Sequence, residues 1–99
     1  MLSSTIIITI LSLMGSVTAR IYHNCGCKTN GEYNVELSKD TCTNWALSGE
    51  PHTHFDGYSC IDKGSGRGID GNPWETHCKD VWEVAHAGNR GSAVGWCWH

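Results

Sequence analysis

The chain has 99 residues, which is the size of one domain and leaves no room for two hydrophobic cores. Its 7 Lys and Arg and 10 Asp and Glu give a formal net charge of −3 at pH 7. Because such a balance offers no basic patch to neutralise phosphates, the composition argues against a nucleic-acid-binding protein.

Residues 1–19 differ from the rest of the chain, because every charged residue, histidine and cysteine follows Ala19. The apolar run from Ile6 to Val17 is about a dozen residues long, whereas a membrane-spanning helix needs ~20. It is followed by Thr18 and Ala19, which complete the small-residue pattern that a signal peptidase recognises. We therefore predict a secretory signal peptide over residues 1–19, cleaved after Ala19, with a retained membrane anchor as the alternative.

The mature domain, residues 20–99, has few large aliphatic side chains. Leu, Ile, Val and Phe together make up about an eighth of it, less than the roughly one-fifth below which chains are often disordered. It has six cysteines instead, and an even number in a small secreted chain indicates a disulfide framework. Three disulfides at about 3 kcal/mol each contribute about 9 kcal/mol, as much as the net stability of a small domain.

The first half of this domain is expected to contain a strand and a helix. Residues 20–27 alternate weakly between apolar and polar side chains, which predicts a strand, and Asn30-Gly31 is a strong turn signal. Residues 33–37 are compatible with a short strand or a tethered loop. Asp40 is a suitable N-cap for a short helix over residues 41–47, which Gly49 ends.

The second half is expected to contain a hairpin and a final strand. Residues 52–55 predict an edge strand, Asp56-Gly57 a hairpin turn and residues 58–61 the returning strand. The glycine-rich residues 63–71 predict a loop, and residues 92–98 predict the last strand.

A longer helix precedes that last strand. We expect Asn72 to cap it in a capping box with Glu75, and Gly88 to end it. Glu75, Lys79 and Glu83 are spaced by four, as in solvent-exposed ion pairs. The opposite face carries an apolar stripe composed of Trp74, His77, Cys78, Val81, Trp82 and Ala85.

The order strand, helix, strand, strand, helix, strand predicts an α+β fold. We expect a small disulfide-rich sandwich of two helices on a four-stranded antiparallel sheet, of the split β-α-β, ferredoxin-like type. Both helices would cover one face of the sheet and leave the other face open.

All six cysteines can point into the layer between the sheet and the helices. Fifteen pairings are possible, and the sequence alone does not choose among them. If the first strand lies between the third and the fourth, Cys60 and Cys97 are roughly 9–10 Å apart and are not expected to pair. Among the arrangements that remain open, we select Cys25–Cys97, Cys27–Cys78 and Cys42–Cys60.

The order of cysteines resembles that of a known family. The residues concerned are Cys25-Gly26-Cys27-Lys28, Thr41-Cys42, Cys60, Ile69, Trp74, Cys78 and Cys97. This pattern is similar to that of the alpha subunit of the smut-fungus killer toxin and of small secreted fungal effectors that share its fold. The resemblance implies a two-helix, four-strand sandwich and a secreted toxin or effector role, and it implies no catalytic residue.

The aromatic side chains of the last strand are candidate binding residues. If Cys97 faces the helices, the period of two sends Trp96 and Trp98 to the open face, and the same alternation places Tyr22 there. An exposed aromatic patch usually marks a binding surface. The alternative is that loops such as residues 33–37 cover these rings. Arg67, in the glycine-rich loop, is a further candidate contact.

Nothing in the sequence predicts a catalytic residue, a metal site or a cofactor. All six thiols are assigned to disulfides, and the chain has no Gly-x-Ser-x-Gly motif. His52 and His54 could share a metal, but no close set of three or four ligands occurs. His77 and Glu83 are too far apart along their helix to act as an acid-base pair.

We therefore expect a secreted, monomeric, non-enzymatic effector or toxin-like protein that binds a target protein or cell surface of another organism. One alternative is a membrane-perturbing antimicrobial killer toxin, which the negative charge disfavours because anionic bilayers attract cationic surfaces. The other is a small secreted hydrolase or nuclease that depends on histidine.

Overall fold

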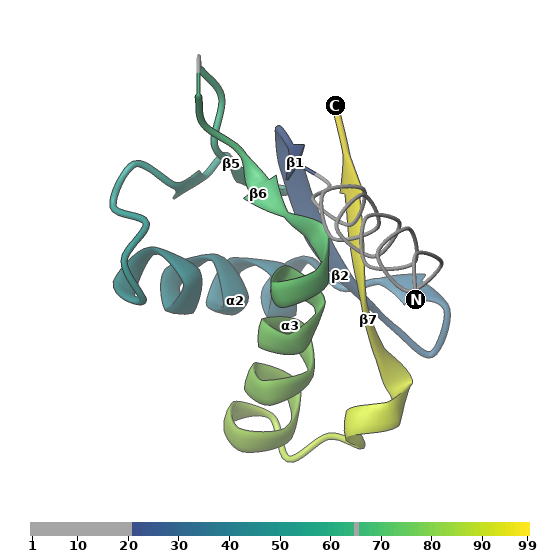
Figure 1. Cartoon of the computed structure of the whole chain (residues 1–99). Helices are drawn as coiled ribbons and strands as arrows, with labels where there is room; N and C mark the ends of the chain where they lie inside the picture. Colours follow the sequence, from purple (N-terminus) through teal and green to yellow (C-terminus); the bar gives the residue numbers. More distant parts are fainter. Residues whose placement is uncertain (1–20, 65) are drawn as a thin grey trace, which may run out of the picture.

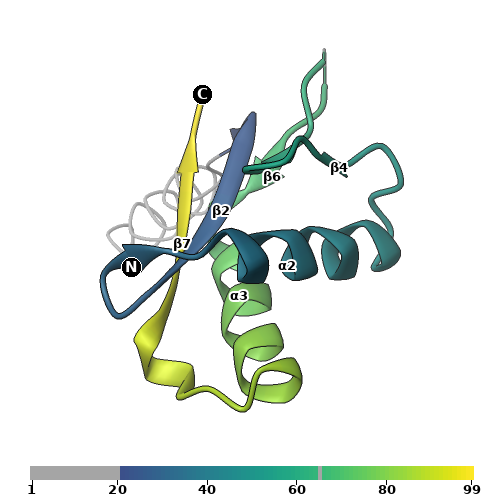
Figure 2. The same ribbon diagram turned by 180° about the vertical axis from the view of Figure 1, so that it is seen from behind.

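The computed structural model describes residues 21–64 and 66–99, so the predicted signal peptide at residues 1–19 lies outside the described residues. Two α-helices pack on one face of an antiparallel sheet (Figures 1 and 2). The helices are α2 (Val35–Leu47), α3 (Gly71–Ala85) and the short 3-10 helix η1 (Arg90–Ser92). The strands are β1 (Ile21–Tyr22), β2 (Asn24–Thr29), β3 (Glu32–Tyr33), β4 (His54–Phe55), β5 (Cys60–Ile61), β6 (Ile69–Asp70) and β7 (Ala93–Trp98).

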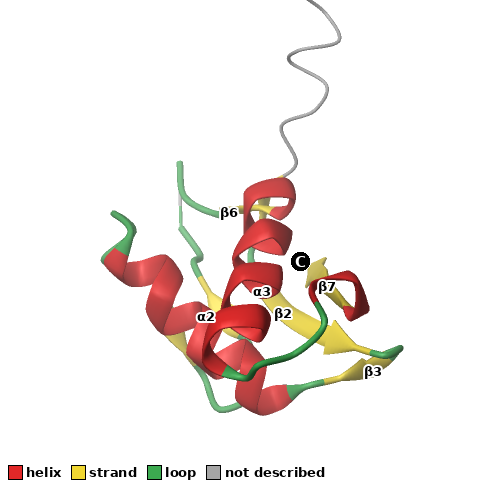
Figure 3. Ribbon diagram, turned by 90° about the horizontal axis from the view of Figure 1, so that it is seen from below, coloured by secondary structure: helices red, strands yellow, loops and turns green. Residues whose placement is uncertain are grey.

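Strand β2 is the centre of the main sheet. Along its whole length it pairs with β7, and along its other edge it pairs with β3 and β5, which in turn pairs with β4; all of these pairings are antiparallel. Strand β2 thus lies between β5 and β7. Seen from below, α2 and α3 lie together on one side of β2 and β7 (Figure 3).

The predicted strand over residues 20–27 is interrupted at His23. Ile21 and Tyr22 form β1, which pairs with β6 in a separate two-stranded sheet, and the chain bends at His23 before β2 begins. The predicted loop over residues 63–71 therefore ends in a strand. Side chains alternate between the two faces only along an unbroken strand. The alternation in β2 therefore does not tell which way the side chains before His23 point.

Helix α2 begins six residues earlier than predicted. Asn34, rather than Asp40, is its N-cap, and Asn34 Oδ1 accepts a hydrogen bond of 2.9 Å from Leu37 N. The first two turns face the core with polar residues, since Ser38 and Thr41 are fully buried. The Ser38 hydroxyl accepts from Cys27 N at 2.8 Å and donates to Asn34 O at 2.7 Å. A hydrophobic pattern cannot reveal these buried turns.

Helix α3 begins two residues earlier than predicted, ends at Ala85 before Gly88 is reached, and has much of the predicted stripe. Trp74, Cys78 and Val81 are buried, and Trp82 packs against the core at its edge. The predicted cap is wrong: Asp70 caps the helix by accepting from Asn72 N at 3.1 Å.

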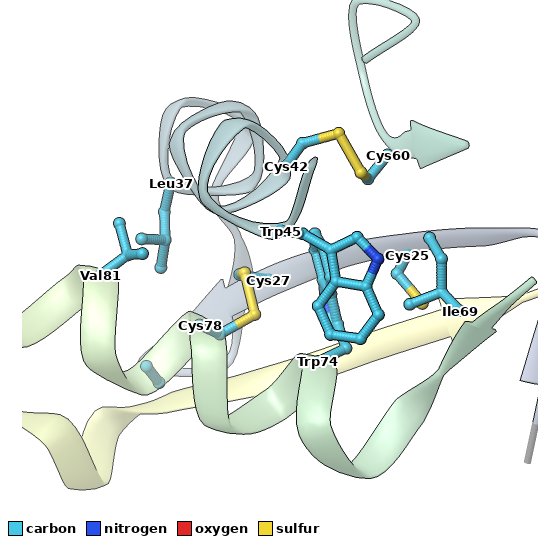
Figure 4. Close-up of a cluster of buried hydrophobic side chains, with 11 residues drawn as sticks. Cys25, Cys27, Leu37, Cys42, Trp45, Cys60, Ile69, Trp74, Cys78 and Val81 are labelled. Atoms are coloured by element: carbon cyan, nitrogen blue, oxygen red, sulfur yellow. A yellow bond between two sulfur atoms is a disulfide. The ribbon is translucent and has the colours of Figure 1, made fainter. Parts of the chain in front are cut away.

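The core is the layer between sheet and helices, and sulfur occupies much of it (Figure 4). Three disulfides close it, with Cα–Cα distances of 4.0 Å for Cys25–Cys97, 5.9 Å for Cys27–Cys78 and 5.3 Å for Cys42–Cys60. These are the three selected pairs, and no described cysteine is free. Trp74 is fully buried among them, and its Nε1 donates to Gly26 O at 2.8 Å.

Helix α3 protects the exposed edge of β7. Among the described residues β7 pairs only with β2, so its outer edge has backbone groups without a strand partner. Glu75 Oε2 accepts from Gly95 N at 3.0 Å, and Lys79 Nζ donates to Ala93 O. Glu75 and Lys79 are therefore bound to backbone, and the prediction that they form solvent-exposed ion pairs is wrong. Charged groups that cap an edge strand hinder pairing with another chain.

We expect the double substitution Glu75→Ala, Lys79→Ala to make the protein self-associate through β7. Without both side chains, one backbone N–H and one backbone C=O on the outer edge of β7 have no partner, and the same strand carries the exposed Trp96. The loss of each hydrogen bond also lowers the free energy of unfolding by about 1 kcal/mol. Sedimentation across a concentration series measures the effect. Glu83→Ala, which changes an exposed carboxylate on the same helix, is the control and should remain like the wild type. A strictly monomeric double variant would contradict the edge-capping role.

Candidate binding face

The outer face of the sheet, away from the helices, carries the two predicted tryptophans. Every second residue of β7, beginning with Ala93, faces the helices. Ala93 is fully buried, and a Cβ added to Gly95 would lie 3.1 Å from the Cα of Glu75 in α3. Trp96 and Trp98 belong to the other set, as their pairing with Gly26 and Asn24 of β2 requires. Trp96 is 49% exposed, whereas Trp98 is partly buried.

Two tyrosines that sequence reasoning missed complete this aromatic face, which we define as Tyr33, Tyr58, Trp96 and Trp98. The rings of Tyr33 and Tyr58 stack with their centroids 4.3 Å apart and their planes at 16°. The Trp98 ring lies 6.3 Å from each of them, tilted by about 60°. The Tyr33 hydroxyl donates to Tyr58 O at 2.7 Å, and Tyr58 is 52% exposed.

Gly26 leaves the space into which Tyr33 fits. A Cβ on Gly26 would lie 1.9 Å from the Tyr33 Oη and 2.4 Å from two of its ring carbons. Position 26 therefore requires glycine, because any side chain there would overlap the Tyr33 ring on the outer face of the sheet. The neighbouring Cys25 and Cys27 point the other way, into the core. The alternative, that residues 33–37 cover the tryptophans, applies only in part, since Tyr33 packs beside Trp98 and leaves Trp96 exposed.

A positive charge lies at the Trp96 end of this face. Lys28 Nζ lies 3.5 Å from the centroid of the Trp96 ring, a cation–π contact. Lys28 and Trp96 come from the paired strands β2 and β7, so this contact spans the two central strands of the sheet.

The turn that presents Tyr58 is held by a carboxylate. Asp56 Oδ1 accepts from Ser59 N at 2.7 Å and from Tyr58 N at 2.8 Å. These backbone N–H groups, Ser59 first, lower the pKa of Asp56 below its usual value. The confirmed hairpin turn at Asp56-Gly57 thus places Tyr58 beside Tyr33.

Burial raises the pKa of Tyr33 above the usual tyrosine value of 10.0, and the nearby Tyr58 and Asp56 act in the same direction. A phenol whose pKa is raised by folding stabilises the protein below pH 10 and loses that contribution as the pH rises through the folded-state pKa. We expect the free energy of unfolding to fall above pH 10, and to fall less steeply in Tyr33→Phe. Denaturation at a series of pH values, with tyrosinate absorbance as a second signal, measures this. Equal slopes for the two proteins would contradict it.

Tyr22 does not belong to the aromatic face, so its predicted position is wrong. A Cβ on Gly71 would lie 3.1 Å from the Tyr22 Cε2 and 4.0 Å from the Cys97 Sγ, which places the Tyr22 ring beside α3. Its ring centroid is 5.2 Å from that of His99. The physical reason is the bend at His23, which separates Tyr22 from the alternation of β2.

Arg67 lies at a separate pocket. Its Nε is 3.3 Å from Asp62 Oδ1, and the Asp62 side chain is 4% exposed. The pocket has a volume of about 450 Å³ and is also lined by Ile21, Glu50 and His52. The Arg67 side chain is 40% exposed, so it remains accessible at this pocket while it pairs with a buried carboxylate.

Two histidines, His77 and His86, link the two helices. His77 Nδ1 is 2.6 Å from Asn44 Oδ1, and His86 Nε2 is 2.8 Å from Asp40 Oδ2, so both join α3 to α2. Within residues 21–64 and 66–99, no group of three His, Cys, Asp or Glu side chains is arranged to hold a metal ion. The same part of the chain contains no helix of the length and apolar character needed to cross a membrane.

Comparison with protein-family models, with curated proteins and with solved structures gave no match for this chain.

Proposed function

We propose that this is a secreted, non-enzymatic binding protein of effector or toxin type, and that the aromatic face contacts a target protein or cell surface of another organism. The observation that carries the proposal is the exposure of Trp96 and Tyr58 on the same open face of the sheet as Trp98. Tryptophan and tyrosine dominate the binding energy of protein interfaces.

The arrangement of these rings favours binding because they are already ordered. Tyr58 is fixed by its stack on Tyr33 and by the turn at Asp56, and Trp96 is fixed by Lys28. An interface built from ordered side chains loses less conformational entropy when it forms. Contiguous exposed aromatic area is otherwise disfavoured on a protein in water.

The proposal extends to fold type and origin. The strand order β7-β2-β5-β4, with α2 and α3 on one face, supports a split β-α-β arrangement of the ferredoxin-like type. The three disulfides are typical of extracellular proteins and support secretion. Together with the cysteine order, these features support a relationship to the killer-toxin alpha-subunit fold and to small fungal effectors.

We expect Trp96→Ala, Trp98→Ala to bind target cells at least tenfold more weakly while the protein remains folded, since Trp96 is half exposed and both rings lie outside the disulfide core. The labelled oxidised protein is applied to intact fungal cells and to plant cells, and bound fluorescence is measured. Ile21→Ala, Val35→Ala, which removes similarly exposed apolar area elsewhere, is the matched control.

Two results would contradict the proposal. One is equal binding by the wild type and the tryptophan variant. The other is a tryptophan variant that does not fold, which would assign these rings to a second core. Release of dye from lipid vesicles by the wild type at low concentration would instead support the membrane-perturbing alternative.

A further inference from the structure

Helices α2 and α3 form an apolar groove on their outer side, away from the sheet. The groove has a volume of about 370 Å³, and its walls come from one face of each helix. The lining residues are Asp40, Thr43, Asn44 and Leu47 of α2, and Asp80, Val81, Val84 and Ala85 of α3. Positions 40, 43, 44 and 47 repeat at three and four, so they form a continuous stripe on α2.

Two aliphatic side chains at this groove are the most exposed large hydrophobic residues that the structure describes. Leu47 is 82% exposed and Val84 is 84% exposed, whereas Tyr58 on the aromatic face is 52% exposed. Val81, between them and the core, is 8% exposed and forms part of the groove floor. Their exposure leaves apolar area in water that a partner could bury.

Leu47 also borders a second hollow. A pocket of about 220 Å³ lies on its other side, lined among others by Thr43, Ala46 and Phe55. Leu47 and Thr43 line both hollows, so Leu47 forms a ridge with a depression on each side. A surface of this shape accepts the spaced apolar side chains of an amphipathic helix.

The charges around the groove define the chemistry of its occupant. The charged side chains that line it are both acidic, Asp40 and Asp80, and they remain 44% and 53% exposed beside their partners His86 and Arg90. A second copy of the chain would bring carboxylates against carboxylates, and an anionic membrane would be repelled. A helix with lysine or arginine beside its apolar stripe has the complementary charge.

We propose that the α2–α3 groove binds a cationic amphipathic helix of a partner protein, with apolar side chains packed around Leu47 and Val84 and basic side chains near Asp40 and Asp80. This site lies on the helical side of the molecule and is independent of the aromatic face. The protein therefore has two separate contact surfaces.

The test uses the oxidised full chain and a fluorescent helical peptide of Leu and Lys, about 18 residues long, with leucine spaced by three and four. We expect the peptide to bind, and the same peptide with Glu in place of every Lys not to bind. Leu47→Ser, Val84→Ser should weaken binding about tenfold, because both side chains are removed from the interface. Asp40→Asn, Asp80→Asn should weaken it and reduce its dependence on salt.

Trp96→Ala, Trp98→Ala is the control and should bind the Leu/Lys peptide as the wild type does, which separates this site from the proposed function. Equal binding of the Lys and Glu peptides, or unchanged binding by Leu47→Ser, Val84→Ser, would overturn the proposal. So would a wild-type dimer that the serine variant abolishes, because the occupant would then be a second copy. Vesicle leakage abolished by the same variant would assign the groove to lipid.

Discussion

Removing the Cys27–Cys78 disulfide by Cys27→Ala, Cys78→Ala is expected to unfold the protein or lower its free energy of unfolding by about 4 kcal/mol. The bridge joins residues 51 apart and ties α3 to the central strand, so its loss releases a large loop in the unfolded chain. Both half-cystines are fully buried, and their removal also leaves a gap beside Trp74. Net stabilities of small domains are about 5–15 kcal/mol, so this loss would remove between about a quarter and most of the stability.

The near-ultraviolet circular dichroism of the tryptophans measures this effect, because Trp45 and Trp74 lie edge to face in the core with their ring centroids 5.6 Å apart. Cys42→Ala, Cys60→Ala is the matched control, since that bridge closes residues only 18 apart and should cost about 3 kcal/mol. A fully reduced protein that keeps its tryptophan signal and its thermal midpoint would show that the disulfides are not the main source of stability.

Gly26→Ala is expected to destabilise the fold by about 2 kcal/mol and to disturb the aromatic face as well. The added methyl group would overlap the Tyr33 ring, so either the ring leaves its stack with Tyr58 or the strand shifts. A shift of β2 at this point would also lengthen the hydrogen bond between Trp74 Nε1 and Gly26 O. Chemical denaturation measures the loss, and binding to target cells is expected to weaken with it.

A double-mutant cycle with Tyr33→Ala isolates the contact. The combined variant Gly26→Ala, Tyr33→Ala should be more stable than the sum of the two single effects predicts, because the overlap no longer exists. Gly91→Ala is the control: the nearest atom to its added Cβ would be Asn89 Oδ1 at 3.4 Å, so little change is expected. Strict additivity in the Gly26 cycle would show that Tyr33 is not packed against this glycine.

The sequence predicted local features well where one physical rule controls them. Asn30-Gly31 forms the predicted turn, and both residues adopt the left-handed conformation, with φ of 52° and 84°. The apolar spacing along α3 identified its buried side. Its caps were missed because several adjacent polar residues, such as Asp70 and Asn72, can each accept the first hydrogen bond, and geometry selects one of them.

Only part of the aromatic face was predicted from the sequence. Alternation along β7 correctly sent Trp96 and Trp98 outward, since that strand is uninterrupted and Cys97 fixes its inner side. The same rule failed for Tyr22, because the chain bends at His23. Tyr33 and Tyr58 were not predicted, because they belong to different hairpins and meet across 25 residues of sequence.

The sequence by itself determined the disulfide-stapled α+β class, the layer that holds the cysteines and the direction of the last two tryptophans. These follow from spacing within single helices and strands, which local sterics control. Only the tertiary structure decided that Tyr33 covers Gly26, that Glu75 and Lys79 cap β7, and that Leu47 and Val84 share a groove. Such contacts join elements that are distant along the chain, and their geometry depends on how the whole core packs.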